Sequence, residues 1–417
     1  MNILLKSAKI VCSENKALHL KKRDILIKKG IIEKIASSVD LPSNTKLVNH
    51  KNLHVSLGWF DSGVSFGEPG FEERETIANG LHVASNSGFT DVVLNPNTNP
   101  LPDTSSDVVF LKDRAKGNST NLHPLGSLTV NSEGKDLAEL FDMKNAGAVA
   151  FYDFKKQISN PNLLKIALLY AQNFDGLVFS YPQDGQIQGK GIVHEGEVST
   201  LMGLKGIPAL AEELQISRDL FILEYTEGKL HIPTVSTANS VKLIAAAKKK
   251  GLNVSCSVAI HNLIFTDENL KGFDSNFKVS PPLRGKSDTK ALIKGLKDGT
   301  VDFVTTDHLP IDIEEKRVEF DNAVDGTIGL ESAFGSLNQI FGLEDTIALL
   351  TKGRERFGLE SPIFKEGEKA CLTLFDPSEE MTFTMDSILS TSKNSMFLES
   401  QLKGKVFGII NNDQISI

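Results

Sequence analysis

A segment central to the fold is residues 58–70, which read Gly-Trp-Phe-Asp-Ser-Gly-Val-Ser-Phe-Gly-Glu-Pro-Gly. Its apolar first half predicts a short buried strand, and the Gly-Glu-Pro-Gly sequence predicts the turn that ends it. A helix is expected to open at residues 75–77. A second apolar strand is expected within residues 88–100, which read Gly-Phe-Thr-Asp-Val-Val-Leu-Asn-Pro-Asn-Thr-Asn-Pro. Strand, helix and strand in this order predict a βα unit.

The same alternation continues over residues 56–364. Further strands are expected at 90–94, 148–151, 176–179, 230–235, 253–258 and 303–306, and helices at 161–173, 236–250 and 288–298. Asn160 is expected to cap the first of these helices, with Pro161 at its first position. Repeated βα units over about 300 residues favour an α/β fold with a TIM-like (β/α)8 barrel, whose active site lies at the carboxyl ends of the strands. A doubly wound open sheet is the alternative, but no Gly-rich phosphate loop supports it.

Both ends of the chain have a different character from the middle. Residues 1–55 and 365–417 contain short apolar runs separated by polar turns, which predicts strands without helices. We expect these two segments to form one composite β-sandwich domain, and residues 56–364 to form the barrel domain. Two unrelated terminal hairpins are the alternative.

Composition and charge exclude several classes of function. The 417 residues are 40% hydrophobic and 24% charged, and the net charge of −8 gives no basic face for nucleic acid or an anionic membrane. No apolar run is long enough for a membrane span. The three cysteines, at positions 12, 256 and 371, form no CxxC pair, which suits a reducing compartment. We therefore expect a cytoplasmic protein.

The pattern resembles the amidohydrolase superfamily, and within it the dihydroorotases. The first barrel strand of those enzymes carries Asp-x-His-x-His followed by Arg-Glu-Pro-Gly, in the place of residues 61–70 here. The segment that ends in Asp153 and residues 302–311, Asp-Phe-Val-Thr-Thr-Asp-His-Leu-Pro-Ile, also resemble the family. The resemblance covers about residues 3–410 and implies a zinc hydrolase of cyclic amides that acts in pyrimidine biosynthesis.

Most of the metal-ligand positions that the resemblance implies have changed. Of six such positions, only Asp153 and Asp307 remain. The four histidine positions hold residues that are poor zinc ligands: Gly63, Ser65, Tyr181 and Thr234. A nearby histidine, His231, precedes Thr234 by three residues, so strand alternation predicts that it lies on the opposite face and does not substitute.

The positions that bind substrate in the family have changed in a similar way. Asn97 is retained, whereas Gly67 and Ile311 replace the charged or polar partners. In the family the residue at the position of Asp307 both binds metal and acts as general base. Here this retained residue is expected to be vestigial.

Three hypotheses follow, and metal content separates the first from the others. An active cyclic amidohydrolase would need a relocated zinc site that uses Asp153 and Asp307 with His261 or His308. A noncatalytic dihydroorotase-like protein would need no cofactor, and the resemblance implies that it acts as a structural partner of aspartate carbamoyltransferase. A ligand sensor would keep the pocket without the chemistry. The resemblance also implies a homo-oligomer, such as a homodimer.

Without a metal, structural roles are the favoured explanation of the retained aspartates. Asp307 is expected to hydrogen-bond neighbouring strand ends, and Asp153 to be neutralised by Lys155 and Lys156. His261 and His308 are expected to be either part of a polar pocket or satisfied structural histidines. Turn chemistry alone would account for Asn97.

Overall fold

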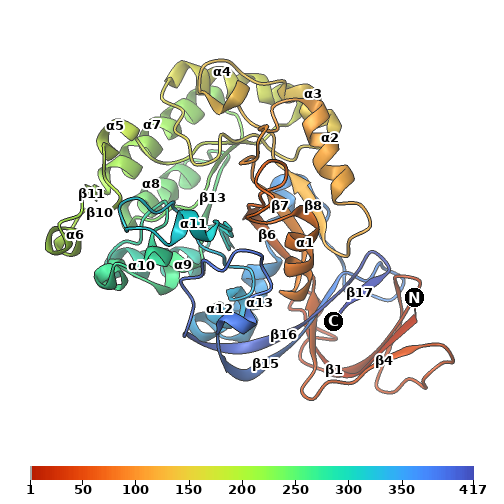
Figure 1. Ribbon diagram of the computed structural model, residues 1–417. Coiled ribbons are helices and arrows are strands. Elements are labelled where there is room, and N and C mark those ends of the chain that lie inside the picture. Colours follow the sequence, from red (N-terminus) through yellow and green to blue (C-terminus); the bar gives the residue numbers. More distant parts are fainter. Residues whose placement is uncertain (1) are drawn as a thin grey trace.

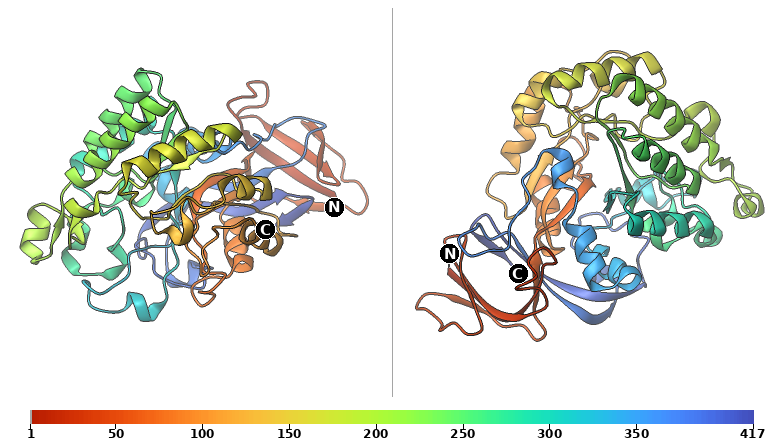
Figure 2. Two further views of the ribbon diagram at one scale, coloured as in Figure 1. Left: turned by 90° about the horizontal axis from the view of Figure 1, so that it is seen from above. Right: turned by 180° about the vertical axis from the view of Figure 1, so that it is seen from behind.

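The computed structural model describes residues 2–417 and has two parts (Figure 1). Helices surround a barrel of short strands, and a curved sheet at the lower right of Figure 1 holds both ends of the chain. The two further views show the same arrangement, with the long helices outside the barrel strands (Figure 2).

The barrel wall has eight strand positions (staves), as the sequence predicts. Seven are parallel strands: β6 (Trp59–Val64), β7 (Phe89–Leu94), β8 (Asn121–Pro124), β9 (Val178–Phe179), β12 (Leu230–Ile232), β13 (Val254–Ala259) and β14 (Phe303–Thr305). The remaining stave, between β8 and β9, consists of single parallel bridges from Phe151 to Gly126 and to Val178. A parallel bridge between Val64 and His308 closes the ring.

Two predicted strands differ from the structure. The segment 148–151 is not a strand, because only Phe151 pairs with its neighbours. The strand predicted at 230–235 ends at Ile232, since Pro233 follows and Thr234 has a φ of 49°, outside the range of extended backbone.

The helices connect these staves along the chain. The larger ones are α1 (Ile77–Asn86), α2 (Ser105–Arg114), α3 (Leu140–Ala146), α4 (Pro161–Ala171), α7 (Leu210–Thr226), α8 (Ala238–Lys249), α10 (Lys286–Asp298), α12 (Ala333–Phe341) and α13 (Leu343–Thr351). The predicted start of α4 is confirmed, because the Asn160 side chain accepts a hydrogen bond from the Asn162 amide at 3.0 Å. None of the helices within residues 2–417 is long and apolar enough to cross a bilayer.

Shorter elements connect the larger ones. They are β10 (Val193–His194), β11 (Gly206–Ile207), α5 (Gly185–Gln188), α6 (Glu197–Met202), α9 (His261–Ile264) and α11 (Ile313–Lys316), with 3-10 turns at Val130–Ser132, Gln172–Phe174, Asp267–Gly272, Ser275–Phe277, Arg354–Phe357 and Met385–Ser387. Several of them lie in the loops above the carboxyl ends of the barrel strands.

The prediction that both chain ends contribute to one composite β-structure is confirmed, and the strands of the two ends belong to one eight-stranded sheet. It contains β1 (Asn2–Val11), β2 (Lys22–Lys28), β3 (Ile31–Ala36), β4 (Lys46–Val48), β5 (His54–Leu57), β15 (Leu372–Thr382), β16 (Gln401–Asn411) and β17 (Gln414–Ser416). Strand β5 pairs in parallel with β1 and antiparallel with β15, so it joins the N-terminal strands to the C-terminal ones. This sheet has its own apolar core. The domain limits at 55/56 and 364/365 stay a prediction.

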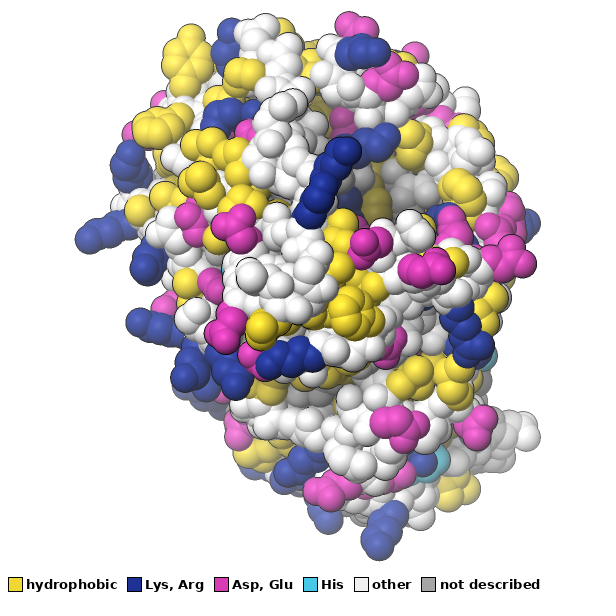
Figure 3. All heavy atoms as spheres, turned by 60° about the vertical axis from the view of Figure 1, so that its left-hand side comes forward, with side chains coloured by type: hydrophobic (Ala, Val, Ile, Leu, Met, Phe, Trp, Pro, Cys, Tyr) yellow, Lys and Arg dark blue, Asp and Glu magenta, His cyan; other side chains and the backbone are white. Residues whose placement is uncertain are grey.

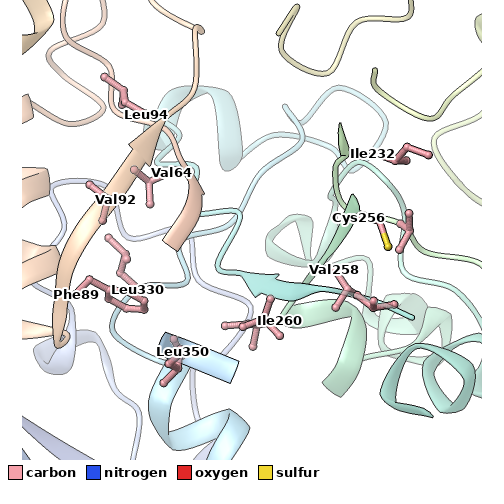
Figure 4. Close-up of a cluster of buried hydrophobic side chains, with 14 of the residues drawn as sticks. Val64, Phe89, Val92, Leu94, Ile232, Cys256, Val258, Ile260, Leu330 and Leu350 are labelled. Carbon is pink, nitrogen blue, oxygen red and sulfur yellow. The ribbon is translucent and has the colours of Figure 1, made fainter. Parts of the chain in front are cut away.

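The main apolar core lies between the barrel strands and the surrounding helices. Figure 4 shows part of it: Leu330 lies beside side chains of β6 and β7, side chains of β12 and β13 lie on the other side of the view, and Leu350 of α13 lies below. A second, aromatic cluster fills the barrel interior and includes Phe60, Phe179, Phe303 and Phe357. Because these rings fill the barrel interior, the space for a site lies at the carboxyl ends of the strands.

Candidate functional site

Two hollows lie at the carboxyl ends of the barrel strands. The inner hollow, ≈ 20 Å³, is lined among others by Gly63, Asn95, Thr234, Ser257 and Asp307. The outer hollow, ≈ 560 Å³, is lined among others by Asn97, Tyr181, Gln183, Ser280 and Ile311. Phe154 and Lys155 line both hollows, so this dipeptide lies at the boundary between them.

The central contact of the site is an ion pair between Lys155 and Asp307. The Lys155 ammonium lies 2.8 Å from the Asp307 carboxylate, and the two side chains are only 12% and 6% exposed. Burial raises the pKa of Asp307, and the adjacent ammonium opposes this shift. The retained family aspartate is therefore already bound to a cation that the chain itself supplies.

Asp153, the other retained ligand position, makes a different set of contacts. Its carboxylate accepts hydrogen bonds from the backbone amides of Leu128 and Thr129 at 2.9 and 3.0 Å, and from the Thr129 hydroxyl at 2.5 Å. The expectation that Lys155 and Lys156 neutralise it is wrong. Lys155 pairs with Asp307, and Lys156 donates to the Ser132 carbonyl at 3.2 Å. Asp153 thus fixes the loop after β8.

Hydrogen bonds between small polar groups occupy the space beside the first two lost histidines. A Cβ on Gly63 would lie 3.2 Å from the Thr305 hydroxyl and 3.6 Å from the Asn95 amide nitrogen. The Asn95 amide in turn donates to the Ser65 hydroxyl at 3.2 Å. Thr305 also donates to Asp61 at 2.8 Å, which ties β14 to β6. A longer side chain at position 63 would disturb this packing.

At the other two lost histidine positions, the Tyr181 side chain is hydrogen-bonded, whereas the Thr234 hydroxyl is buried without a hydrogen-bond partner among residues 2–417. The Tyr181 hydroxyl lies 2.6 Å from the Ser280 hydroxyl. Burial raises the pKa of Tyr181 above its ordinary value, so the side chain stays a neutral phenol. The Thr234 amide donates to the Ser257 hydroxyl at 3.3 Å. Neither residue offers the anionic or imidazole donor that zinc prefers.

The prediction that His231 lies on the face opposite to Thr234 is wrong. The His231 ring nitrogens lie 2.8 Å from the Ser255 hydroxyl and 3.2 Å from the Ser257 hydroxyl, and the ring stacks on Phe303 in the barrel interior. Thr234 approaches the same Ser257 through its backbone amide and lines the inner hollow at the mouth of the barrel interior, so the two residues lie on the same side of the barrel wall. Strand alternation fails here because β12 ends before Thr234. His231 is nevertheless engaged with these serines, below the inner hollow.

The two candidate relocated ligands are fully buried. Burial lowers the pKa of both His261 and His308 to about 3, so both imidazoles are neutral. His308 accepts a hydrogen bond through Nδ1 from the Gly329 amide at 3.2 Å. No protein hydrogen bond reaches either ring nitrogen of His261 from the described residues.

Two of the three substrate-binding positions of the family no longer carry a polar or charged side chain. A Cβ on Gly67 would lie 1.7 Å from the Phe71 carbonyl oxygen, so this backbone admits no side chain. Ile311 is buried, and its amide donates to the Asn394 side chain at 3.1 Å. Only Asn97 keeps its family position beside the outer hollow, where its side-chain oxygen is buried without a hydrogen-bond partner among residues 2–417.

Taken together, the donor groups do not fit the zinc that the family implies. Within residues 2–417, no group of three or more His, Cys, Asp or Glu side chains could hold a metal ion. Asp307 is paired with Lys155, Asp153 binds the loop at 128–129, and the remaining positions carry hydroxyl groups or no side chain. Two separated carboxylates do not make the four-coordinate site that zinc requires.

Lys155 is the residue of the site whose partner was predicted incorrectly from the sequence. Its position two residues after Asp153 led to the wrong partner, since proximity in sequence favoured the nearer carboxylate. One feature of the sequence did point to its role: Lys155 lies just beyond a barrel strand position, in a site from which the metal-binding histidines are absent. Both Lys155 and Asp307 have positive φ, 52° and 48°, a conformation that non-glycine residues adopt uncommonly and that sequence rules do not predict.

Comparison with known proteins agrees with this fold. A family model described as dihydro-orotase-like matches residues 54–240. The dihydroorotase of Caldicellulosiruptor saccharolyticus is 39% identical, over 99% of this chain and 98% of its own, and that of Pelotomaculum thermopropionicum is 37% identical, over 97% and 96%.

Solved structures show the same architecture at low sequence identity. The L-hydantoinase (dihydropyrimidinase) of Arthrobacter aurescens superposes with a TM-score of 0.84 at 19% identity, covering 99% of this chain and 95% of its own. A D-hydantoinase structure gives a TM-score of 0.81, also at 19% identity, covering 100% and 95%. The fold is a TIM barrel with a β-sandwich, as in these structures. The chain belongs to the dihydroorotase-like family.

Proposed function

We propose that this chain is a noncatalytic member of the dihydroorotase-like family that acts as a structural partner of aspartate carbamoyltransferase. The observation that carries the proposal is the ion pair between Lys155 and Asp307, 2.8 Å long and almost fully buried. It engages the carboxylate that serves the family as metal ligand and general base.

The chemistry of the remaining groups supports the absence of hydrolysis. A metal-bound water has a pKa near 7, whereas free water, at about 15.7, is not a nucleophile at neutral pH. A general base must also be free to accept a proton. Asp307 is held by an ammonium instead, and no side chain at position 67 can bind the carboxylate of a substrate.

An exposed apolar surface supports the partner role. Side chains along α4 and α7 are exposed although apolar, and Phe221 and Tyr225 are 69% and 75% exposed; the others are Ile166, Leu169, Tyr170, Leu210 and Leu214. Figure 3 shows hydrophobic side chains gathering at its upper left, beside mixed charges. Exposed apolar patches of this kind typically mark protein–protein contacts.

The proposed absence of hydrolytic activity is tested with protein that is purified without any chelator. Zinc is supplied, and both hydrolysis of dihydroorotate and the reverse cyclisation are measured. The dihydroorotase of Pelotomaculum thermopropionicum is the positive control. We expect no turnover above the protein-free rate, and turnover at enzyme-like rates would contradict the proposal.

The partner half is tested by mixing the chain with aspartate carbamoyltransferase of the same organism and measuring the mass of the eluted species by light scattering. We expect a complex that Phe221→Glu combined with Tyr225→Glu weakens. Leu41→Glu, at a 53% exposed apolar residue in the N-terminal segment, is the matched control and leaves the complex intact. No complex with the unmodified chain would contradict the partner role.

Ligand sensing is a second candidate, and the outer hollow favours it. The hollow offers ≈ 560 Å³ and several amide and hydroxyl groups, and the Asn97 side-chain oxygen is buried beside it without a partner among residues 2–417. A rise in melting temperature with dihydroorotate or carbamoyl aspartate, which Asn97→Ala abolishes, would support this role. The same melting temperature with and without either compound would exclude both as its ligands.

A further inference from the structure

The inner hollow contains a cation in the place where the family implies a metal. Lys155 and Asp307 line this hollow together with Gly63 and Thr234, two of the positions that have lost their histidine. We infer that the Lys155 ammonium is a built-in counter-ion that replaces the metal: it neutralises Asp307, supports the strand ends around it and closes the inner hollow. This inference rests on the proposed function in one respect, the absence of zinc from the site.

The burial of Asp307 creates the need for such a cation. Its carboxylate is 6% exposed, and among residues 2–417 the Lys155 ammonium is the one hydrogen-bond donor to it, at 2.8 Å. A buried carboxylate without a partner is strongly destabilising, and removing one member of a buried ion pair leaves the other uncompensated. In a metal-containing relative the metal would supply this charge.

The backbone around Lys155 is built to hold the side chain in this position. Its amide donates to the Tyr152 hydroxyl at 3.0 Å, and Tyr152 is itself buried in the aromatic cluster of the barrel. The positive φ of 52° turns the chain sharply after the stave. The ammonium is therefore held by a fixed turn and not by a free surface loop.

The location of Lys155 also explains the small size of the inner hollow. Because Lys155 and Phe154 line both hollows, they separate the ≈ 20 Å³ inner hollow from the ≈ 560 Å³ outer one. A divalent cation entering from outside would have to displace the ammonium from its carboxylate. It would then meet hydroxyl and amide groups, which are poor substitutes for imidazole.

The other charged groups near the pair do not take over this role. The charge of Asp307 raises the pKa of Tyr152 and Tyr181. The charge of Lys155 lowers the pKa of Asp325 and Lys316. Asp307 feels no charge other than that of Lys155 strongly enough to shift its pKa. Asp307 therefore depends on Lys155 for its charge partner, whereas Lys155 also acts on Asp325, Lys316 and His261.

A double-mutant cycle tests the inference through the equilibrium constant of unfolding in urea at pH 7.5. Lys155→Met keeps the length of the side chain and removes its charge, and we expect it to raise the unfolding constant about 100-fold or more. Asp307→Asn in the same chain should recover at least tenfold of this loss, because no charge is then left buried. Lys156→Met, which loses only a contact to the Ser132 carbonyl, is the matched control and should be near the unmodified chain.

Two results would overturn the inference. One is a Lys155→Met chain as stable as Lys156→Met, and the other is a doubly substituted chain that has lost the sum of the two single losses. If Lys155→Met alone does not fold, recovery of soluble folded protein on adding Asp307→Asn supports the inference, and failure to recover contradicts it.

Zinc content of the unmodified chain, measured on the same preparation, separates this inference from the proposed function. Zinc bound to the unmodified chain would defeat the proposed function and this inference together. A zinc-free chain whose Lys155→Met variant loses no stability would defeat this inference alone.

Discussion

The carbonyl oxygen of Phe71 lies 1.7 Å from the point where a Cβ on Gly67 would be. The turn that produces this contact is held at both ends, because Gly67 donates to the Glu75 carbonyl at 2.8 Å and accepts from the Phe71 amide at 2.9 Å. The family places an arginine at this position. Here Gly67 replaces that arginine, and the backbone around it leaves no room for any side chain. Restoring the arginine by one substitution would therefore not restore the family's conformation.

Substitution at Gly67 should therefore destabilise the chain strongly. Gly67→Ala forces the turn open, and we expect a loss of about 3 kcal/mol or more in the free energy of unfolding, measured in urea. Gly272→Ala is the control, because a Cβ there meets nothing within 4 Å. A Gly67→Ala chain as stable as the control would show that the turn is free to adopt the family conformation.

Asp153 should contribute to stability and not to metal binding. Asp153→Ala leaves the buried amides of Leu128 and Thr129 without an acceptor, and we expect a loss of about 2 to 4 kcal/mol in unfolding free energy. Asp153→Asn keeps one acceptor oxygen and should lose less. Zinc content should be the same in all three proteins. A fall in zinc content on substitution, with stability unchanged, would assign Asp153 to a metal site.

His231 should make the fold sensitive to mild acid. Burial lowers its pKa well below the ordinary value, aided by the nearby charges of Arg356 and Lys248. Below about pH 6.5 the unfolded chain binds a proton that the folded chain does not, so stability falls as pH falls, by up to about 1.4 kcal/mol per pH unit.

The test compares unfolding free energies at pH 7.5, 6.5 and 5.5. His231→Gln should be less stable at pH 7.5, since it loses ring stacking, but its stability should fall less steeply on acidification. His82→Gln, at an exposed residue, is the control and should keep the slope of the unmodified chain. Equal slopes in all three proteins would show that His231 does not titrate on unfolding.

The architecture could be predicted because it depends on short-range patterns. Alternating apolar strands and amphipathic helices give the barrel, and the β-only ends give the terminal sheet. The failures occur where pairing is minimal or the backbone turns unusually. The 148–151 stave pairs through Phe151 alone, and β12 ends before Thr234, whose positive φ breaks the alternation that assigned His231 to the wrong face.

The site could be predicted only as a set of positions. Sequence identified the replaced ligands, but it could not say that Asp153 binds the loop at 128–129 or that Lys155 crosses to Asp307, 152 residues away. Both outcomes depend on the direction in which a side chain leaves a turn. The position of the Phe71 carbonyl oxygen beside Gly67 likewise depends on the path of the backbone, which composition and motif spacing do not predict.

Zinc content shows whether the mouth of the barrel is free of metal. The protein is purified without chelator, supplied with zinc, passed through a desalting column and measured by elemental analysis beside the dihydroorotase of Caldicellulosiruptor saccharolyticus. We expect much less than one zinc ion per folded chain. One or more tightly bound zinc ions per chain, retained after desalting and lost in Asp307→Asn, would contradict this expectation.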